Sequence, residues 1–263
     1  MFRMLVTIIF PAFNEEKRLK NCLEKTQAYL NTQGFSYEVI VINDGSHDAT
    51  GQILADFQKR FHLKIINCEK NLGKGAAIKT GVMAARGDFI LFSDVDLSVP
   101  IETLTKFLEK VKGGFDVVIG SRRVKGVKIL THQSDAREFM GHAFTKISNL
   151  VLGTSFADFT CGFKLFNKKA AKKIFALQRI DGWAFDAEVL FLARKLGFKV
   201  SQMGIVWSDV KDSKVHFPQD AITSLLGLLE IRLSAWRGYY FLDTNKQDQE
   251  RGKTYSRKPS KIL

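Results

Sequence analysis

The chain is poor in cysteine and proline, with three and four respectively among 263 residues. Cys22, Cys68 and Cys161 are far apart and form no CxxC pair, so neither a disulfide framework nor a zinc site is indicated, and we expect a reducing compartment. Long hydrophobic runs are also missing: none approaches about 18 uncharged residues, so we expect no membrane span. The first apolar run, residues 4–10, is too short for a signal peptide.

Acidic side chains are outnumbered, with 27 Asp and Glu against 40 Lys and Arg and a formal net charge of +13. Unless it serves solubility alone, such an excess predicts an anionic partner: nucleic acid, an acidic membrane surface or a phosphorylated substrate. Nucleic-acid binding calls for basic residues interleaved with exposed aromatics. Most aromatic residues here fall in apolar runs, so no nucleic-acid partner is expected, and a nucleic-acid-binding protein is the remote alternative.

The first half of the chain alternates short β-branched runs with amphipathic stretches. The apolar runs cover residues 5–10, 38–42, 63–66, 89–92 and 117–119, and helical patterns cover 15–32, 48–61, 74–85 and 101–111. This alternation predicts an α/β, Rossmann-like fold with a mostly parallel central sheet flanked by helices. In such sheets, ligands bind beyond the carboxyl ends of the strands.

Polar and glycine-rich segments follow all five predicted strands. They are Pro-Ala-Phe-Asn-Glu (11–15), Asn-Asp-Gly-Ser (43–46), Asn-Leu-Gly-Lys-Gly (71–75), Asp-Val-Asp (94–96) and Gly-Ser-Arg-Arg (120–123). Asp94 and Asp96 flank a single residue after a buried strand, where two carboxylates can share Mg²⁺ or Mn²⁺ with substrate phosphates. Such a cation would neutralise a departing diphosphate.

Two of these segments suit a nucleobase or ribose, although each also has a purely structural interpretation. Asp44 can accept hydrogen bonds from a base or ribose, or can simply form a turn. Pro11, Ala12, Asn14 and Glu15 can surround a base, or can serve only to cap the first helix.

A third segment suits phosphate. Asn71, Gly73 and Lys74 open a predicted helix, and the start of a helix attracts anions. The segment is not a Walker A motif, because the glycine spacing and the Lys-Ser/Thr pair are missing. An ordinary ATPase is therefore not indicated.

Further charged residues follow the fifth strand. Arg122 and Arg123, with Ser121 before them and Arg137 at the start of the next predicted helix, are candidates for holding an acceptor phosphate. For any one arginine, a solvated surface position is the simpler interpretation. Residues 124–136 between them are expected to form a polar loop.

Asp158, Asp186 and Glu188 are the candidates for acid–base catalysis or for supporting the site. Asp186 and Glu188 are two positions apart, so on a helix they would not share a face. Both can point inward only in a loop or at a helix start, where helix capping is a simpler role for Asp186.

The C-terminal part predicts a strand near residues 198–206 and an amphipathic helix over 220–241. Charged residues interrupt the apolar pattern of that helix, which suits a helix lying in a membrane interface and equally a helix packed on the core. The basic tail, residues 243–263, is expected to be disordered and to touch anionic lipid.

In this order and spacing, the motifs resemble those of a family-2 inverting glycosyltransferase with the GT-A fold. Segments 158–166, 183–188, 206–209 and 213–214 are similar to the dolichyl-phosphate β-glucosyltransferase branch, whose near relatives are the dolichyl-phosphate mannose synthases. The resemblance covers about residues 4–240. It divides residues 1–242 into a nucleotide-sugar-binding half (1–123), an acceptor half (124–215) and an interfacial helix (216–242).

The resemblance implies a nucleotide-sugar donor and a polyprenyl or dolichyl phosphate acceptor. Asp44 would contact the base, Asp94 and Asp96 the diphosphate and metal, and Arg122 and Arg137 the acceptor phosphate. The mannose synthases carry a serine at the position of Gly141, so that contact is not expected here.

The expected reaction transfers glucose from UDP-glucose with inversion, on the cytoplasmic face of a membrane. The alternatives are GDP-mannose as donor, or a sugar hydroxyl as acceptor. Members of the glucosyltransferase branch often carry an N-terminal anchor, so here the amphipathic helix, the loop after Arg123 or the basic tail is expected to contact an anionic membrane surface. The oligomeric state is left open.

Overall fold

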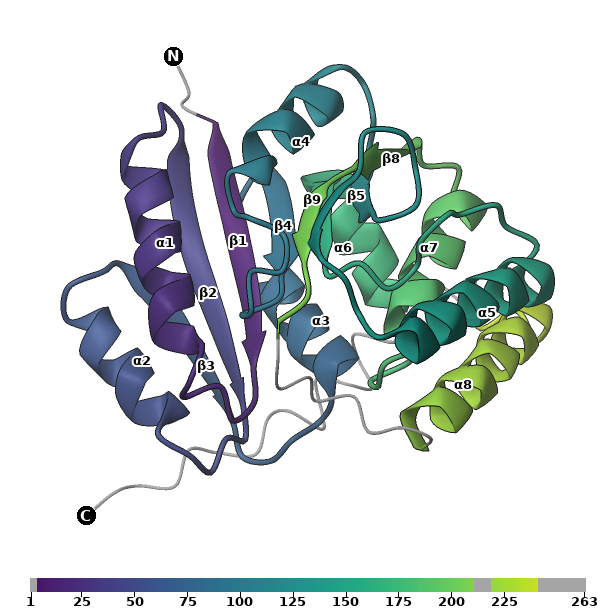
Figure 1. Ribbon diagram of the computed structural model, residues 1–263, viewed down its shortest axis with the longest axis horizontal. Coiled ribbons are helices and arrows are strands. Elements are labelled where there is room, and N and C mark those ends of the chain that lie inside the picture. Colours follow the sequence, from purple (N-terminus) through teal and green to yellow (C-terminus); the bar gives the residue numbers. More distant parts are fainter. Residues whose placement is uncertain (1–3, 211–218, 241–263) are drawn as a thin grey trace.

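The computed structural model describes residues 4–210 and 219–240, and its main feature is a seven-stranded sheet (Figure 1). The strand order is β3-β2-β1-β4-β7-β5-β8. The strands are β1 (Leu5–Ala12), β2 (Ser36–Asp44), β3 (Leu63–Cys68), β4 (Phe89–Ser93), β5 (Val117–Ser121), β7 (Phe163–Asn167) and β8 (Val200–Gly204). All neighbours pair in parallel except β7, which runs antiparallel to both β4 and β5. The predicted α/β class and mostly parallel sheet are confirmed.

Eight helices are present in the described part of the chain. They are α1 (Leu19–Asn31), α2 (Thr50–Gln58), α3 (Lys74–Ala84), α4 (Thr103–Lys112), α5 (Asp135–Leu152), α6 (Lys168–Leu177), α7 (Phe185–Lys195) and α8 (Gln219–Trp236). Apolar residues of α1, α2 and α4 share one core cluster, and those of α3, α6 and α7 share the other. The two clusters lie on opposite faces of the sheet, because neighbouring strand residues such as Ile8 and Ile9 belong to different clusters.

Several element predictions need correction. The first helix begins at Leu19 instead of residue 15. The expected loop at 124–136 contains β6 (Lys128–Thr131), which pairs in parallel with β9 (Val206–Ser208). The sequence reading also missed β7 and α6. Because β7 has only five residues and includes a lysine, its apolar pattern is too short to stand out.

Helix α8 packs on the core, as one of its two interpretations predicts, and the interfacial interpretation stays a prediction. Leu228 and Ile231 are buried, and the helix packs against α5 and α7. The other side remains apolar and exposed. No helix in the described ranges is both long and apolar enough to cross a bilayer. The predicted tail 243–263 and the motif at 213–214 lie outside the described residues.

Candidate active site

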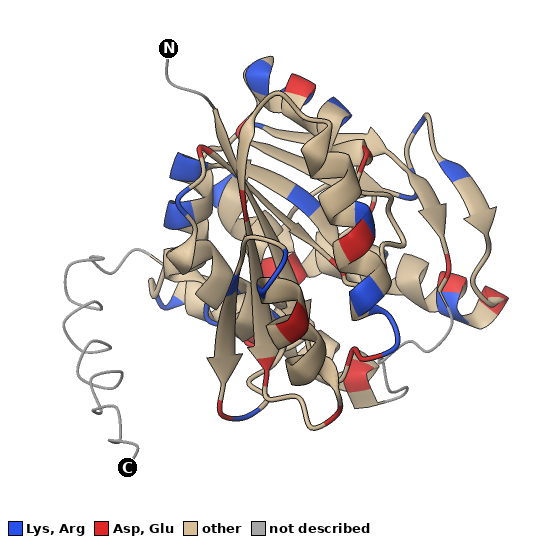
Figure 2. Cartoon of the chain, turned by 90° about the vertical axis from the view of Figure 1, so that its left-hand side faces the viewer, with Lys and Arg blue, Asp and Glu red and all other residues tan. Residues whose placement is uncertain are grey.

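The candidate residues gather at the carboxyl edge of the sheet, where the strand order reverses. β1 has β2 on one side and β4 on the other, which makes a crevice at their ends the expected ligand position. Figure 2 shows acidic segments at and just beyond the strand arrowheads. Because β7 runs in the opposite direction, the loop before it, residues 158–162, reaches this same edge.

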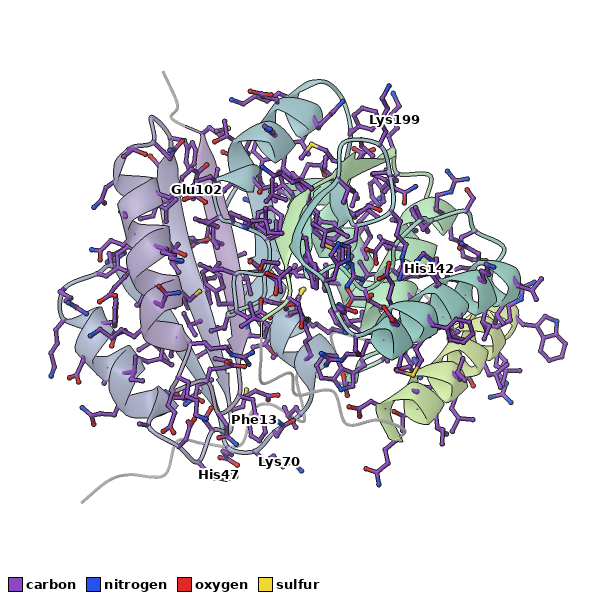
Figure 3. The ribbon with its side chains drawn as sticks, viewed as in Figure 1. Phe13, His47, Lys70, Glu102, His142 and Lys199 are labelled. Carbon is purple, nitrogen blue, oxygen red and sulfur yellow. The ribbon has the colours of Figure 1, made fainter. Side chains whose placement is uncertain are left out.

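Two hydrogen bonds join the loops that follow β1 and β2. The Asn14 N–H donates to Ser46 Oγ (2.9 Å), and the His47 N–H donates to Asn14 Oδ1 (2.8 Å). Asn14 has a φ of 52°, and α1 has no side-chain cap, so the capping interpretation is wrong for Asn14. Figure 3 shows Phe13, His47 and Lys70 together at this edge of the molecule.

Pro11 and Ala12 end β1, and Glu15 lies in the turn that leads to α1. The Glu15 N–H donates to Thr50 Oγ1 (2.7 Å), and its carboxylate forms an ion pair with Arg18 (2.7 Å). Beside them is a cavity of about 450 Å³. Burial acts against the charge of Arg18, but Glu15, and then the Asp-Val-Asp pair, raise its pKa. The sequence reading had not singled out this cation.

Asp44 links the second and third loops. Its buried carboxylate accepts the N–H groups of Leu72 (2.9 Å) and Gly73 (3.0 Å). Burial raises its pKa even though these two donors act in the opposite direction. Asp44 therefore fixes the position of the exposed segment at Asn71. This segment also lies so close to Gly45 that a Cβ added there would be 2.5 Å from the Asn71 nitrogen, so position 45 requires glycine.

The start of α3 is not an open anion site. Gly73 precedes the helix with a φ of 101°, and the Gly75 and Ala76 N–H groups donate to the carbonyl of Asp181 (2.7 and 3.2 Å). These two donors are therefore not available to a phosphate. The cation of this segment lies beside the next loop, because Lys74 Nζ is 2.6 Å from Asp94 Oδ1.

Asp94 and Asp96 lie in the tight turn that follows β4. The Asp94 N–H donates to the carbonyl of Gly162 (3.1 Å), and Asp96 Oδ1 accepts the N–H of Ser98 (2.9 Å). Burial, and then the charge of Asp94, raise the pKa of Asp96, a penalty that a bound cation would relieve.

This donor set fits magnesium or manganese. Within the ranges that the structure describes, no cluster of three or more His, Cys, Asp or Glu side chains forms a protein cage. Two carboxylates that leave the remaining positions to substrate phosphates and water are the usual arrangement for such a hard ion.

Arg122 is held by a buried carboxylate. Asp158 is fully buried and accepts the Arg122 guanidinium through both oxygens (2.7 and 2.9 Å) and its backbone N–H (3.1 Å). The guanidinium also donates to Thr160 Oγ1 (2.7 Å) and lies 5.5 Å from the Trp207 ring centre. Asp158 thus aims the arginine, and its engaged oxygens favour a positioning role over that of a base.

Arg137 reaches the same segment of chain as Arg122. Its guanidinium lies 4.0 Å from Asp209, two residues after the Trp207 ring that Arg122 contacts. The structure therefore brings both predicted phosphate-binding arginines to residues 207–209. Ser121 is buried and accepts the Arg123 N–H (3.1 Å), which gives its hydroxyl a structural partner.

The Arg123 guanidinium lies against Gly141, the position at which the resemblance led us to compare a serine. Arg123 donates to Thr145 Oγ1 (2.6 Å), and a Cβ built at Gly141 would lie 2.7 Å from its Nη2. A larger residue at 141 would make this guanidinium move. Glycine there is matched to the Arg123 conformation of this chain.

Asp186 and Glu188 lie in the first turn of α7 and are both buried, because the helix is buried on all sides from Phe185 to Ala193. Asp186 forms a buried ion pair with Lys164, a lysine that the sequence reading had not singled out although it interrupts an apolar run. Glu188 accepts the N–H groups of Arg179 and Ile180, which brace the loop that leads to Asp181. Burial raises the pKa of both carboxyls. Catalytic roles for them remain predictions, and these contacts favour positioning.

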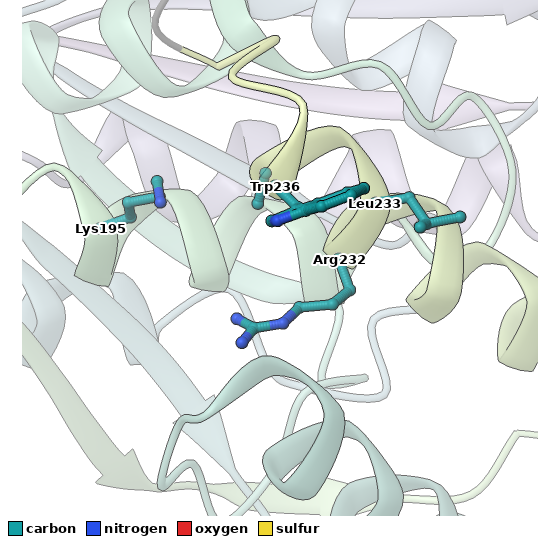
Figure 4. Close-up of a pocket in the computed structure, with 5 residues that line it drawn as sticks. Lys195, Arg232, Leu233 and Trp236 are labelled. Carbon is teal, nitrogen blue, oxygen red and sulfur yellow. The ribbon is translucent and has the colours of Figure 1, made fainter.

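Helices α5 and α8 lie side by side (Figure 1). Both helices expose apolar side chains. We call this set the α5–α8 face: Phe139, Ile147 and Leu150 of α5, with Ile222, Leu225, Leu226, Leu229, Leu233 and Trp236 of α8. Next to it, a cavity of about 400 Å³ is lined by Lys195 and Arg232, with the indole of Trp236 beside them (Figure 4).

Comparison with known proteins identifies the family. The family model for glycosyl transferase family 2 matches residues 7–175. A dolichyl-phosphate beta-glucosyltransferase of Trichomonas vaginalis is 33% identical over 252 residues, covering 89% of this chain and 76% of the relative. Another from Drosophila melanogaster is 33% identical, covering 80% and 69%, and the human one is 29% identical, covering 88% and 77%.

Solved structures share the fold at low sequence identity. Glucosyl-3-phosphoglycerate synthase from Mycobacterium tuberculosis, crystallised with Mn²⁺, UDP-glucose and glycerol 3-phosphate, has a TM-score of 0.65 at 17% identity, covering 88% of this chain and 80% of that one. TarS from S. aureus with UDP-GlcNAc has a TM-score of 0.57 at 19% identity, covering 97% and 74%. Together with the family model and the relatives, these matches confirm the predicted resemblance: the chain belongs to glycosyl transferase family 2, among relatives that are dolichyl-phosphate beta-glucosyltransferases.

Proposed function

We propose that the protein transfers glucose from UDP-glucose to dolichyl or a related polyprenyl phosphate, with inversion at the sugar carbon. The names of its relatives support this acceptor and this sugar. The single observation that carries the proposal is that segment 207–209, which Arg122 and Arg137 contact, is joined to the carboxylate turn. The Ser208 N–H donates to the Ser98 carbonyl (3.0 Å), and the Ser98 N–H donates to Asp96 Oδ1 (2.9 Å). Such a site has groups for a diphosphate on one side and for a second phosphate on the other.

The donor would occupy the crevice between the ends of β1 and β4. Asp44 and the loop at 11–15 are the candidates for the base and ribose, with Asn71, Gly73 and Lys74 beside them. Asp94 and Asp96 would hold Mg²⁺ or Mn²⁺, which supplies positive charge for the departing diphosphate. Manganese in the complex of the mycobacterial synthase supports this choice of ion class.

The acceptor phosphate would lie against Arg122 and Arg137. One of its oxygens attacks the sugar C1, a new C–O bond forms, and the bond from C1 to the diphosphate breaks, releasing UDP. A single displacement inverts the configuration. Since a phosphate monoester has a second pKa near about 6, the nucleophile is already largely dianionic at neutral pH and needs no strong base. The chain's residues then contribute by positioning and by charge.

Attachment to the cytoplasmic face of a membrane completes the proposal. A lipid phosphate acceptor is reached from a membrane surface, and the α5–α8 face offers apolar side chains beside Lys195 and Arg232. This combination of apolar, aromatic and cationic groups is typical of peripheral helices that lie on anionic lipid.

The test is a donor screen with purified full-length protein and dolichyl phosphate. Radiolabelled UDP-glucose and GDP-mannose are compared, with Mn²⁺, with Mg²⁺ and with a chelator. We expect labelled lipid from UDP-glucose only, lost when the metal is chelated. Labelled lipid from GDP-mannose instead of UDP-glucose would show that the proposed donor is wrong. Transfer to a sugar hydroxyl but not to the lipid phosphate would show that the proposed acceptor is wrong.

A further inference from the structure

Lys74 is already paired with the carboxylate that would bind the metal. Its Nζ lies 2.6 Å from Asp94 Oδ1, and its side chain is only 15% exposed, against 34% for Asp94. The two side chains therefore form a short, partly buried ion pair. A divalent ion that binds this carboxylate is therefore repelled by the Lys74 ammonium already beside it.

Asp94 packs its carboxylate against the Gly162 backbone. Its N–H is bound to the Gly162 carbonyl (3.1 Å), and any Cβ at position 162 would overlap its carboxylate. The carboxylate is thus confined between the Gly162 backbone and the ammonium. A metal ion that binds Asp94 would lie close to the Lys74 ammonium, which already contacts Oδ1 of this carboxylate.

A second environment for the Lys74 ammonium lies close by. The ammonium lies 5.5 Å from the centre of the Trp183 ring and interacts electrostatically with buried Asp186. A flexible lysine stem allows it to leave Asp94 while still facing an aromatic ring and a carboxylate.

We propose that Lys74 is a displaceable counter-cation of the metal site: it neutralises Asp94 in the empty enzyme and yields to the divalent ion when the donor diphosphate arrives. Two cations at one carboxylate repel each other, so metal alone binds weakly. The diphosphate adds the negative charge that both cations need. Metal and nucleotide are then bound together and not separately. This inference rests on the proposed donor and metal.

The experiment measures Mn²⁺ binding directly, by electron paramagnetic resonance of free Mn²⁺. Wild type, Lys74→Gln, Lys74→Arg and the exposed control Lys110→Gln are titrated without nucleotide and again with UDP. We expect Lys74→Gln to bind Mn²⁺ about tenfold more tightly than wild type without nucleotide, because a like charge is removed. Lys74→Arg and Lys110→Gln should stay near wild type. With UDP, the advantage of Lys74→Gln should disappear.

Equal or weaker Mn²⁺ binding by Lys74→Gln without nucleotide overturns the inference, as does an equal gain in Lys110→Gln. Circular dichroism melting of each variant guards against misfolding, and Lys74→Ala provides a second neutral variant that must behave like Lys74→Gln. Glucose transfer by wild type is measured separately. If wild type transfers glucose and Lys74→Gln shows no gain, only this inference fails; if the gain appears without transfer, only the proposed function fails.

Discussion

At the scale of single residues, the Arg122–Asp158 pair shows how a candidate base can instead be a support. Asp158 is fully buried, and both of its oxygens bind the arginine. Burial alone would raise the pKa of the Asp158 carboxyl, but the charge and hydrogen bonds of Arg122 lower it to about 2. A carboxylate with so low a pKa is a poor proton acceptor at neutral pH, so we assign Asp158 to positioning.

Asp158→Asn tests this assignment through stability. Removing one partner of a buried pair leaves the other uncompensated, so we expect a loss of about 3 kcal/mol in the free energy of unfolding at neutral pH, measured by urea denaturation. The folded pKa lies below the unfolded value of about 4, so the pair's contribution is complete above about pH 4 and is lost as the pH falls toward 2. The difference in unfolding free energy between wild type and Asp158→Asn should therefore decrease as the pH falls from about 4 toward 2.

The exposed pair of Asp56 and Lys59 supplies the control. Asp56→Asn removes a carboxylate from a solvent-accessible ion pair, and the stability should change little. If Asp158→Asn were as stable as wild type yet inactive, a direct chemical role for Asp158 would return.

At the scale of elements, α7 connects the C-terminal helix to the donor loops. Glu188 in the first turn of α7 accepts the Tyr240 hydroxyl (2.7 Å), just after α8, and the N–H groups of Arg179 and Ile180. The same loop carries Asp181, whose carbonyl caps the start of α3. This buried carboxylate therefore accepts hydrogen bonds from three residues and ties α7 to the loop at 179–181 and to the segment after α8.

Tyr240→Phe should weaken this connection without changing its shape. The ring is kept, but one hydrogen bond to a buried carboxylate is lost, which is worth about 2 kcal/mol in unfolding free energy. Its neighbour Tyr239 contacts the Arg179 guanidinium through its ring, at 4.9 Å, so Tyr239→Phe is a matched control that should remain near wild type. Thermal and urea unfolding measure both; equal effects in the two variants would contradict the assigned hydrogen bond.

At the scale of the whole molecule, charge and apolar surface act together. The chain carries a net charge of +13, and the α5–α8 face lies beside Lys195 and Arg232. Trp236 is 84% exposed and Leu150 is 85% exposed, so large apolar side chains are left in contact with solvent. Exposed patches of this kind usually mark an interaction surface.

We expect the full chain to sediment with vesicles that contain phosphatidylserine and much less with phosphatidylcholine alone. Leu229→Asp should reduce vesicle binding about tenfold, because it replaces an exposed apolar side chain that would enter the lipid with a charge that lipid phosphates repel. Met83→Asp, an exposed apolar position on α3 outside this face, is the matched control and should bind like wild type. Equal binding by Leu229→Asp and wild type would show that the α5–α8 face is not the membrane-binding surface.

Sequence patterns were most informative where the signal lies within a few consecutive residues. The strand–helix alternation, the Asp-Val-Asp turn and the glycine-containing loops each depend on local backbone preferences, and they were enough to predict the fold class and the family. The same local reasoning missed β7, because five residues with Lys164 among them carry too little pattern. Of the two interpretations of Asn14, helix capping is wrong, because its side chain accepts the His47 N–H of a neighbouring loop, and the nucleotide-binding role stays a prediction.

What only the tertiary structure decided is which groups remain available for a ligand. The Asp181 carbonyl accepts hydrogen bonds from N–H groups at the start of α3. Lys74 forms an ion pair with Asp94, and Asp158 forms an ion pair with Arg122. Each contact joins residues far apart in the chain, so each depends on how helices and strands pack. The sequence by itself determined the chemical groups at the sheet edge, because parallel strand ends must meet there. Their pairing was determined by packing, because distances between remote side chains are not a local property.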